Sequence, residues 1–303
     1  MNALQITIHV PLALLLPPVL LGVINKTKAL VAGRAGPPVL QLWFDLVKLA
    51  RKGSVFSTTT TWVFRAGPVA GFTTALLAAL LVPLGNHPAP LSFAGDFVLF
   101  AYLLGLGRFF TVAAALDTGS PFEGMGGARE ATFSCLAEPA MFFSLLVLVR
   151  LSGSLSLNGM LGPTLPAMWS GAGASLVLVV VSLLIVLLAE NCRIPFDDPN
   201  THLELTMIHE VMVLDHSGPA FAMILWGAAI KLFVFGALLV RIALPMETDV
   251  WAGWGILVAG QIGVAVAVGI VESVMARLRL LQVPGLLVAA CLLSAFGIIL
   301  LAR

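Results

Sequence analysis

Eight long apolar runs restrict this chain to one class of fold. They cover approximately residues 3–24, 68–84, 96–116, 132–151, 167–189, 217–241, 251–271 and 283–302. A run of about 20 apolar residues can cross a bilayer as an α-helix, whereas the short alternating segments of a membrane barrel are absent. Only 10% of the residues are charged, against roughly 25% in a soluble domain. The sequence therefore predicts an all-α, polytopic membrane protein with about eight transmembrane helices in a single domain, 1–303.

Basic residues are unequally shared between the two sets of connections. One set carries Lys26, Lys28, Arg34, Lys48, Arg51, Lys52, Arg129, Arg193, Arg277 and Arg279, and the other set carries Arg150 and Arg241, with Arg303 at the end of the chain. By the positive-inside rule, the connections at about 25–67, 117–131, 190–216 and 272–282 are expected in the cytoplasm and both termini outside. No Lys or Arg precedes the first run, so a retained helix is expected rather than a cleaved signal peptide.

The first two of these connections contain distinct patterns. Between Pro38 and Gly53, apolar and polar residues alternate as in an amphipathic helix with basic residues near its end. Such a helix either lies at the lipid headgroups or forms a lid or docking face. In the connection 117–131, Gly124, Gly126 and Gly127 follow no strand and precede no Lys-Ser/Thr pair, which excludes a phosphate loop. A tight, flexible turn that contacts a partner is expected there.

The segment 190–219 is the most polar part of the chain, with six of the fifteen acidic residues and three of the five histidines. Its Asp-Asp-Pro sequence predicts a helix that starts near residue 198 and ends near residue 214. On that helix, His202, His209 and His216 would share one face. Successive histidines seven residues apart lie about 10.5 Å apart along the axis, too far to bind one metal ion. The face is then either a titrating surface that meets a partner or simply solvated.

The residues offer no complete active site or cofactor site. Cys135, Cys192 and Cys291 are scattered without a C-x-x-C spacing, so neither an iron–sulfur nor a zinc site is expected in this chain. No Ser/His/Asp set is recognisable, and no basic, aromatic-rich patch indicates nucleic acid. Any redox centre is expected in a partner protein.

Ionisable residues inside apolar runs are costly and therefore indicate function. Glu138, Glu190 and Lys231 lie in or at the edge of such runs, and Arg108 and Glu272 lie near helix ends that are expected on the cytoplasmic side. These five residues are candidates for a proton path. Structural ion pairs give the same pattern, and the last two residues could also extend to the interface.

The polar segment resembles a known family. ENCRIPFDDPNTHLELTMIHEVMVLDHSGP resembles the central cytoplasmic loop of the respiratory complex I membrane subunit that docks the peripheral arm, with matches at Ala189, Glu190, Arg193, Pro195, Phe196, Asp197 and Pro199. Asp198 and the continuation THLELTMIHEVM depart from that subunit and are similar to the corresponding subunit of group 4 [NiFe] hydrogenases, including the formate hydrogenlyase type. DTGSPFEGMGGAREATFSCLAEP and ESVMARLRLLQVP are similar to the same branch.

This resemblance implies an anchoring and coupling subunit in the cytoplasmic (inner) membrane. Its partners would be the hydrogenase large and small subunits, or complex I-like peripheral subunits, together with antiporter-like membrane subunits. The [NiFe] centre and iron–sulfur clusters would lie in those partners. Glu138 and Glu190 match acidic residues of the chamber that links the redox site to proton channels. The candidate docking residues are Arg129, Glu130, Arg193, Asp197, Asp198, His202, Glu204, His209, Glu210 and Asp215.

Two other functions remain open from the sequence. The first is the quinone-site subunit of a complex I-type NADH dehydrogenase, although the departures between residues 198 and 210 weigh against quinone binding. The second is a free-standing ion transporter, for which related halves with broken helices would be expected. No clear internal repeat is visible.

Overall fold

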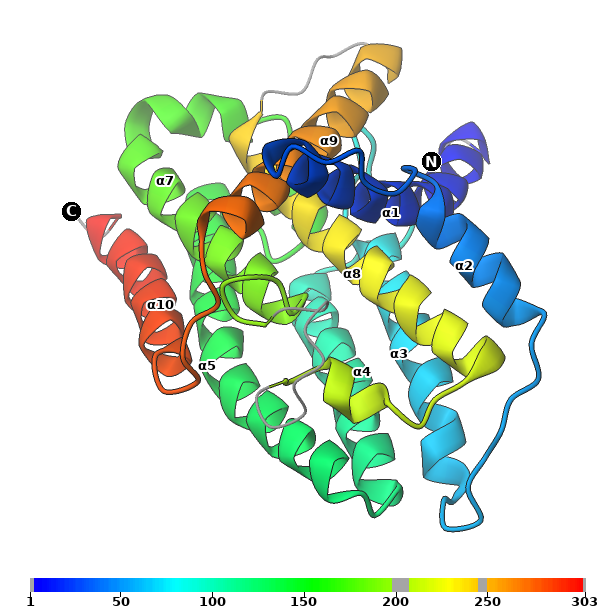
Figure 1. The fold of residues 1–303 in the computed structure, drawn as a ribbon. Helices are drawn as coiled ribbons and strands as arrows, with labels where there is room; N and C mark the ends of the chain where they lie inside the picture. Colours follow the sequence, from blue (N-terminus) through cyan, green and yellow to red (C-terminus); the bar gives the residue numbers. More distant parts are fainter. Residues whose placement is uncertain (1–2, 198–206, 245–249, 302–303) are drawn as a thin grey trace.

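The computed structural model describes residues 3–197, 207–244 and 250–301. All regular elements in these ranges are helices, and eight of them are long and apolar enough to cross a membrane. The predicted all-α membrane fold is therefore confirmed. The long helices are α1 (Ala3–Val31), α3 (Trp62–Leu81), α4 (Asp96–Asp117), α5 (Pro121–Ser152), α7 (Leu165–Glu190), α8 (Gly218–Ala243), α9 (Val250–Val274) and α10 (Val283–Leu300), and the short ones are α2 (Gln41–Ala50), α6 (Leu157–Met160) and the 3₁₀ helix η1 (Glu210–Val213) (Figure 1).

Helix α8 is the central element of the bundle. Of its most apolar stretch, 67% is buried, against 28–44% in the other seven spans. It packs against α1, α2, α3, α7 and α9, while α10 packs against α5 and α7. Figure 1 shows α8 in the middle of the molecule, with α1 crossing over it. A polar residue in the middle of α8, such as Lys231, is therefore placed in the interior of the protein.

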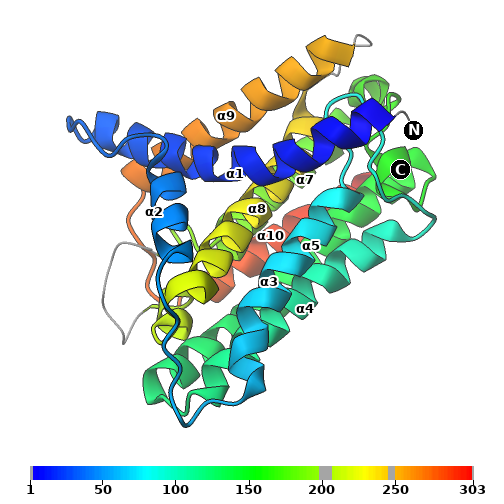
Figure 2. The same cartoon turned by 90° about the vertical axis from the view of Figure 1, so that its right-hand side faces the viewer.

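The connections gather at two opposite ends of the bundle. At one end, here called the basic end, the segments that follow α1, α4, α7 and α9 contact one another. For example, the backbone N–H of Leu278 donates to the carbonyl of Pro195 at 2.9 Å, and the N–H of Val55 donates to Ser217 Oγ at 3.0 Å. The connections after α3 and α5 lie at the opposite end, where α1 begins and where α8 and α10 end (Figure 2).

The expected amphipathic helix is present as α2. Its Trp43 ring meets Trp226 of α8 edge-on at 5.6 Å between centroids, and Leu46 is buried. Phe44 and Val47 remain exposed. One face of α2 therefore packs on the bundle, and the other face is left free.

The prediction of a flexible turn at residues 117–131 is wrong. Helix α5 already begins at Pro121, so the three glycines of this segment lie within the helix. A Cβ atom on Gly126 would lie 2.4 Å from Val211 Cγ1. Glycine is therefore needed there because η1 packs directly onto the helix.

The predicted helix near residues 198–214 is also wrong where the structure describes it. Residues 198–206 lie outside the described residues, and Met207–Leu214 contains a bend followed by the short helix η1. Two observations explain why the chain follows this path instead of a continuous helix. The Asp197 carboxylate accepts the N–H groups of Ile208 and His209 at 2.9 and 3.2 Å. Residues 211–213 are all buried, which a surface helix with one polar face would not allow.

Candidate functional site

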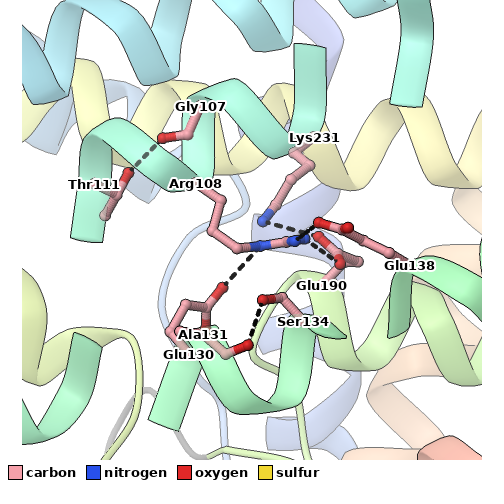
Figure 3. Close-up of polar contacts among 9 residues, drawn as sticks. All are labelled: Gly107, Arg108, Thr111, Glu130, Ala131, Ser134, Glu138, Glu190 and Lys231. Carbon is pink, nitrogen blue, oxygen red and sulfur yellow. Dashed lines mark hydrogen bonds and ion pairs between the residues drawn. The ribbon is translucent and has the colours of Figure 1, made fainter. Parts of the chain in front are cut away.

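Arg108 of α4 lies at the centre of a cluster of charges between four helices, and its own side chain is 10% exposed. Its guanidinium contacts Glu138 of α5 at 2.5 Å, Glu130 of α5 at 3.3 Å and Glu190 at the end of α7. Lys231 of α8 approaches Glu190 from the other side, with 3.7 Å between Nζ and Oε2. Figure 3 shows the side chains converging from these four helices. These five residues are called the Arg108 cluster.

The charges of the Arg108 cluster do not balance. Three carboxylates and two cations give a net charge of −1 when all five groups are ionised. An uncompensated charge is costly in a medium of low dielectric constant, so one additional proton would bring the cluster to neutrality. Because Arg108 contacts all three carboxylates, it can remain paired whichever of them carries that proton.

A small cavity borders the cluster. Its volume is ≈ 90 Å³, which is enough for several water molecules. Small residues of α3, α4 and α8 create this space, and its lining extends to the segment after α7 at the basic end. The lining includes Gly67, Gly71, Gly107, Arg108, Glu130, Glu190, Cys192, His209, Gly227 and Lys231. Water in this cavity would connect the carboxylates of the cluster with the connections at the basic end.

Cys192 and His209 were not recognised from the sequence as parts of an interior site. Both line the cavity next to Glu130, and one ligand atom from each of these three residues lies within 4.8 Å of the other two. Burial, with Lys231 nearby, lowers the pKa of His209 to about 4, so its ring is neutral near pH 7. Burial and the adjacent Glu130 raise the pKa of the Cys192 thiol above its ordinary value.

The structure separates Glu272 from the other candidates for the proton path. Its carboxylate, 0% exposed, contacts Lys28 of α1 at 2.7 Å and Arg193 at 3.4 Å. Among the described residues, no ion pair joins Glu272 to the Arg108 cluster. Neither Arg108 nor Glu272 extends to the interface, because their side chains are only 10% and 0% exposed. Glu272 and Glu190 were grouped from the sequence only because both lie near the end of an apolar run. The packing places them in different clusters.

Several candidate docking residues are instead used inside the chain. Glu130 and His209 line the cavity, and Arg193 pairs with Glu272. Asp197 is 1% exposed and pairs with Arg277 at 2.8 Å. Arg129 donates to the carbonyl of Met207 at 2.7 Å. These residues hold the segment after α7 against the bundle.

The remaining docking candidates fall into two groups. Asp215 is exposed and Glu210 is partly exposed, and both lie at the surface of the basic end. Asp198, His202 and Glu204 lie outside the described residues. The prediction that the histidines share one face is wrong for the two described histidines. His209 lines the cavity, whereas the His216 ring stacks on Phe64 with 4.0 Å between ring centroids.

Comparison with known proteins identifies the family. A family model described as NADH dehydrogenase matches residues 4–303. The chain belongs to this family. Within the NADH dehydrogenase family it is 34% identical to hydrogenase-4 component C of Escherichia coli (strain K12), over 77% of this chain and 72% of that protein. It is 30% identical to formate hydrogenlyase subunit 4 of the same organism, over 87% of each chain.

More distant proteins are similar in sequence or in fold. A subunit of the NADH-quinone oxidoreductase of Rubrobacter xylanophilus is 28% identical over 63% of this chain and 57% of its own length. A chain of the membrane-bound sulfane sulfur reductase, an archaeal respiratory membrane complex, superposes with a TM-score of 0.84 over 98% of both chains at 22% identity. The relatives named above are components of membrane complexes, and the chain itself is a multi-pass membrane protein.

Proposed function

We propose that this chain is the membrane anchor and proton- or ion-coupling subunit of a group 4 [NiFe] hydrogenase complex of the formate hydrogenlyase type. The Arg108 cluster, set against a cavity that leads to the basic end, is the observation that carries the coupling role. Hydrogenase-4 component C and formate hydrogenlyase subunit 4 are relatives at 34% and 30% identity, which supports a hydrogenase as the partner. The [NiFe] centre and iron–sulfur clusters would then belong to partner subunits.

In this proposal the basic end faces the cytoplasm, and both termini lie outside. Lysines and arginines before and within α2 and beside α9 are concentrated at that end, which is the arrangement that the positive-inside rule favours. The soluble redox module would dock there, over the partly exposed Glu210 and the exposed Asp215. Charge changes in the docked module would act on the cavity through the segment after α7.

Glu138 gives the cluster a connection to a neighbouring membrane subunit. Its side chain is 44% exposed, against 12% for Glu130 and 6% for Glu190. An ionisable side chain that faces lipid is costly, so a partner subunit or water is expected to cover it. A proton would then enter from the cavity at Glu190 and leave through Glu138, with Arg108 paired to the carboxylates throughout.

Replacing Glu138 and Glu190 by glutamine in the assembled complex tests the coupling role. We expect ion uptake into vesicles to fall in Glu138→Gln and in Glu190→Gln, while the complex still assembles. Glu123→Gln is the matched control, because Glu123 is a buried carboxylate of the same helix α5 that instead accepts the N–H of Asp215 at 3.1 Å. Wild-type ion uptake in both test variants would refute the role.

The identity of the complex is tested by purifying it through a tag on this chain. Nickel and [NiFe] subunits are expected in the purified material. Their absence would exclude the hydrogenase assignment.

A quinone-site subunit is the second candidate, favoured by the likeness to the NADH-quinone oxidoreductase subunit of Rubrobacter xylanophilus. The ≈ 90 Å³ cavity is smaller than the roughly 300–1,000 Å³ of typical ligand pockets, which weighs against this candidate. Inhibition of the purified complex by quinone-site ligands would reverse that judgement.

A further inference from the structure

Three side chains on one wall of the cavity have the chemistry of metal ligands. Glu130 of α5, Cys192 after α7 and His209 before η1 each offer one ligand atom, and these three atoms lie within 4.8 Å of one another. We propose that these residues form a binding site for a zinc ion or a similar late first-row divalent ion. The spacing of the histidines excluded a site made by His202, His209 and His216 together. It did not address a site in which His209 is joined by a thiol and a carboxylate from other segments.

The separations are close to those of a tetrahedral site. Zinc binds sulfur at about 2.3 Å and nitrogen or oxygen at about 2.0–2.2 Å, so neighbouring ligand atoms in a tetrahedron lie about 3.3–3.7 Å apart. The ligand atoms of Glu130, Cys192 and His209 lie within 4.8 Å of one another, so they need to approach one another by at most about 1.5 Å. Small side-chain rotations toward the shared cavity would achieve this.

Charge and ligand type favour zinc over magnesium or calcium. A thiolate, a carboxylate and a neutral imidazole carry two negative charges, which a divalent ion neutralises. Sulfur and imidazole ligands select zinc and other late transition metals, whereas magnesium and calcium prefer oxygen. Three protein ligands leave the fourth position open to the cavity, as in zinc sites that keep a water molecule.

The surrounding structure holds the ligands in place. Cys192 has a positive φ of 50°, a conformation that costs a non-glycine residue energy and is concentrated at functional sites. Its turn is closed by the N–H of Arg193, which donates to the carbonyl of Leu188 at 2.8 Å. Asp197 fixes the backbone of His209, and Arg108 contacts Glu130 at 3.3 Å. Ordered outer partners of this kind orient metal ligands.

Metal titration of the purified full chain in lipid nanodiscs tests the site directly. After treatment with a chelator, we expect one zinc ion per chain to bind, and cobalt to bind with an intense sulfur-to-cobalt absorption band. Cys192→Ser should abolish that band. His209→Gln and Glu130→Gln should weaken zinc binding by at least about 100-fold, because loss of an outer partner alone costs about 10–100-fold.

The chain offers a control for two of the three ligands. Cys135→Ser removes an exposed cysteine, and His216→Gln removes a buried histidine that stacks on Phe64 outside the cavity. Both variants should bind zinc and cobalt as the wild type does. Equal binding by Cys192→Ser and the wild type would place the metal elsewhere and overturn the proposal, as would the absence of zinc binding to the wild type.

Labelling of the wild-type protein gives a second test that needs no variant. Zinc should protect Cys192, but not Cys135, from alkylation by a maleimide, as read by peptide mass spectrometry on the chain or on its intact complex. Equal labelling of Cys192 with and without zinc would contradict the site. The proposal does not depend on the coupling role, because zinc binding and protection are measured without ion movement.

Discussion

Two sets of charged residues, one beside the cavity within the bundle and one at the end opposite the basic end, have partners of different kinds. In the Arg108 cluster, two cations face three carboxylates beside a cavity. At the opposite end, Asp96 accepts the N–H of Leu157 at 2.7 Å and the hydroxyl of Ser156 at 2.8 Å. Arg241, also at that end, donates to the carbonyls of Gly85 and Leu161.

The two sets differ in whether their partner groups can gain or lose a proton near neutral pH. Backbone groups and the serine hydroxyl neither gain nor lose protons near neutral pH, so Asp96 and Arg241 are fixed by groups with constant charge. The carboxylates of the Arg108 cluster can each take up a proton, and the cluster carries one negative charge in excess when fully ionised. Burial of an ionisable residue therefore does not by itself indicate function, and the type of partner separates structural from coupling residues.

The largest effects are expected for the two arginines. Arg108→Gln leaves three carboxylates with Lys231 as the only remaining cation of the cluster. Breaking a buried ion pair in this way costs about 3–5 kcal/mol, and coupled ion movement should be lost. Arg241→Gln should also lower the free energy of unfolding, because carbonyls lose their donors, but each assembled complex should still move ions normally. Denaturant unfolding in detergent and ion uptake per complex measure the two effects, and equal loss of uptake in both variants would remove the distinction.

A smaller effect is expected for Asp96. Asp96→Asn keeps one carbonyl acceptor but cannot accept both the Leu157 N–H and the Ser156 hydroxyl as well as a carboxylate does. The free energy of unfolding should fall by about 1–3 kcal/mol, as for other unsatisfied buried groups. Ser156→Ala, which removes only the hydroxyl donor, should cost less. A loss of ion uptake per assembled Asp96→Asn complex would show that the opposite end also takes part in coupling.

The length of the apolar runs was enough to predict the eight spans, because lipid permits few other structures for such segments. It was not enough for residues whose position depends on packing. The glycines near the start of α5 are typical of a turn, and only the contact of Gly126 with η1 explains why they lie in a helix. In the same way, the helix expected up to Leu214 gave way to a path fixed by the Asp197 side chain.

The positions of charged residues within or near the ends of the apolar runs also predicted only part of the site. Arg108, Glu138, Glu190 and Lys231 were recognised because they interrupt apolar runs or lie near the ends of such runs, and the structure brings these four together. Glu130 and His209 were taken for surface residues because they lie in polar segments. Packing of η1 on α5 turns both toward the cavity, and no spacing within the sequence reports a contact between segments so far apart along the chain.

His216 represents a third way to bury an ionisable residue, in which the group stays neutral. Its ring stacks on Phe64, and burial lowers its pKa to about 4 from an ordinary value of about 6.5. Between these two pH values the unfolded chain binds more protons than the folded chain, so stability falls as the pH falls. The stabilisation is nearly complete above about pH 6.5, and about 1 kcal/mol of it should be lost at about pH 5.5.

Comparison with His216→Phe isolates this contribution from those of other titrating groups. Phenylalanine can keep the ring stacking but cannot take up a proton. The difference in free energy of unfolding between the wild type and His216→Phe should therefore change between pH 7 and pH 4, with the wild type losing stability relative to the variant. A difference that stays constant over this range would show that His216 is not buried in neutral form.

The smallest effect is expected for Gly71→Ala. This variant tests whether ion movement through the Arg108 cluster needs the cavity or only the ion pairs, in contrast to Asp96 and Arg241. Gly71 lines the cavity, and an added Cβ would meet Thr111 Oγ1 at 3.9 Å, an ordinary contact. The fold should therefore gain about 0.5–1 kcal/mol from the better helix former, while ion uptake slows because a methyl group displaces water. Gly124→Ala on α5, which meets nothing within 4 Å, should give a similar gain in stability with unchanged uptake. If Gly71→Ala moves ions at the wild-type rate, protons pass among the carboxylates without the cavity water, and the charge imbalance alone accounts for the difference between the two sets.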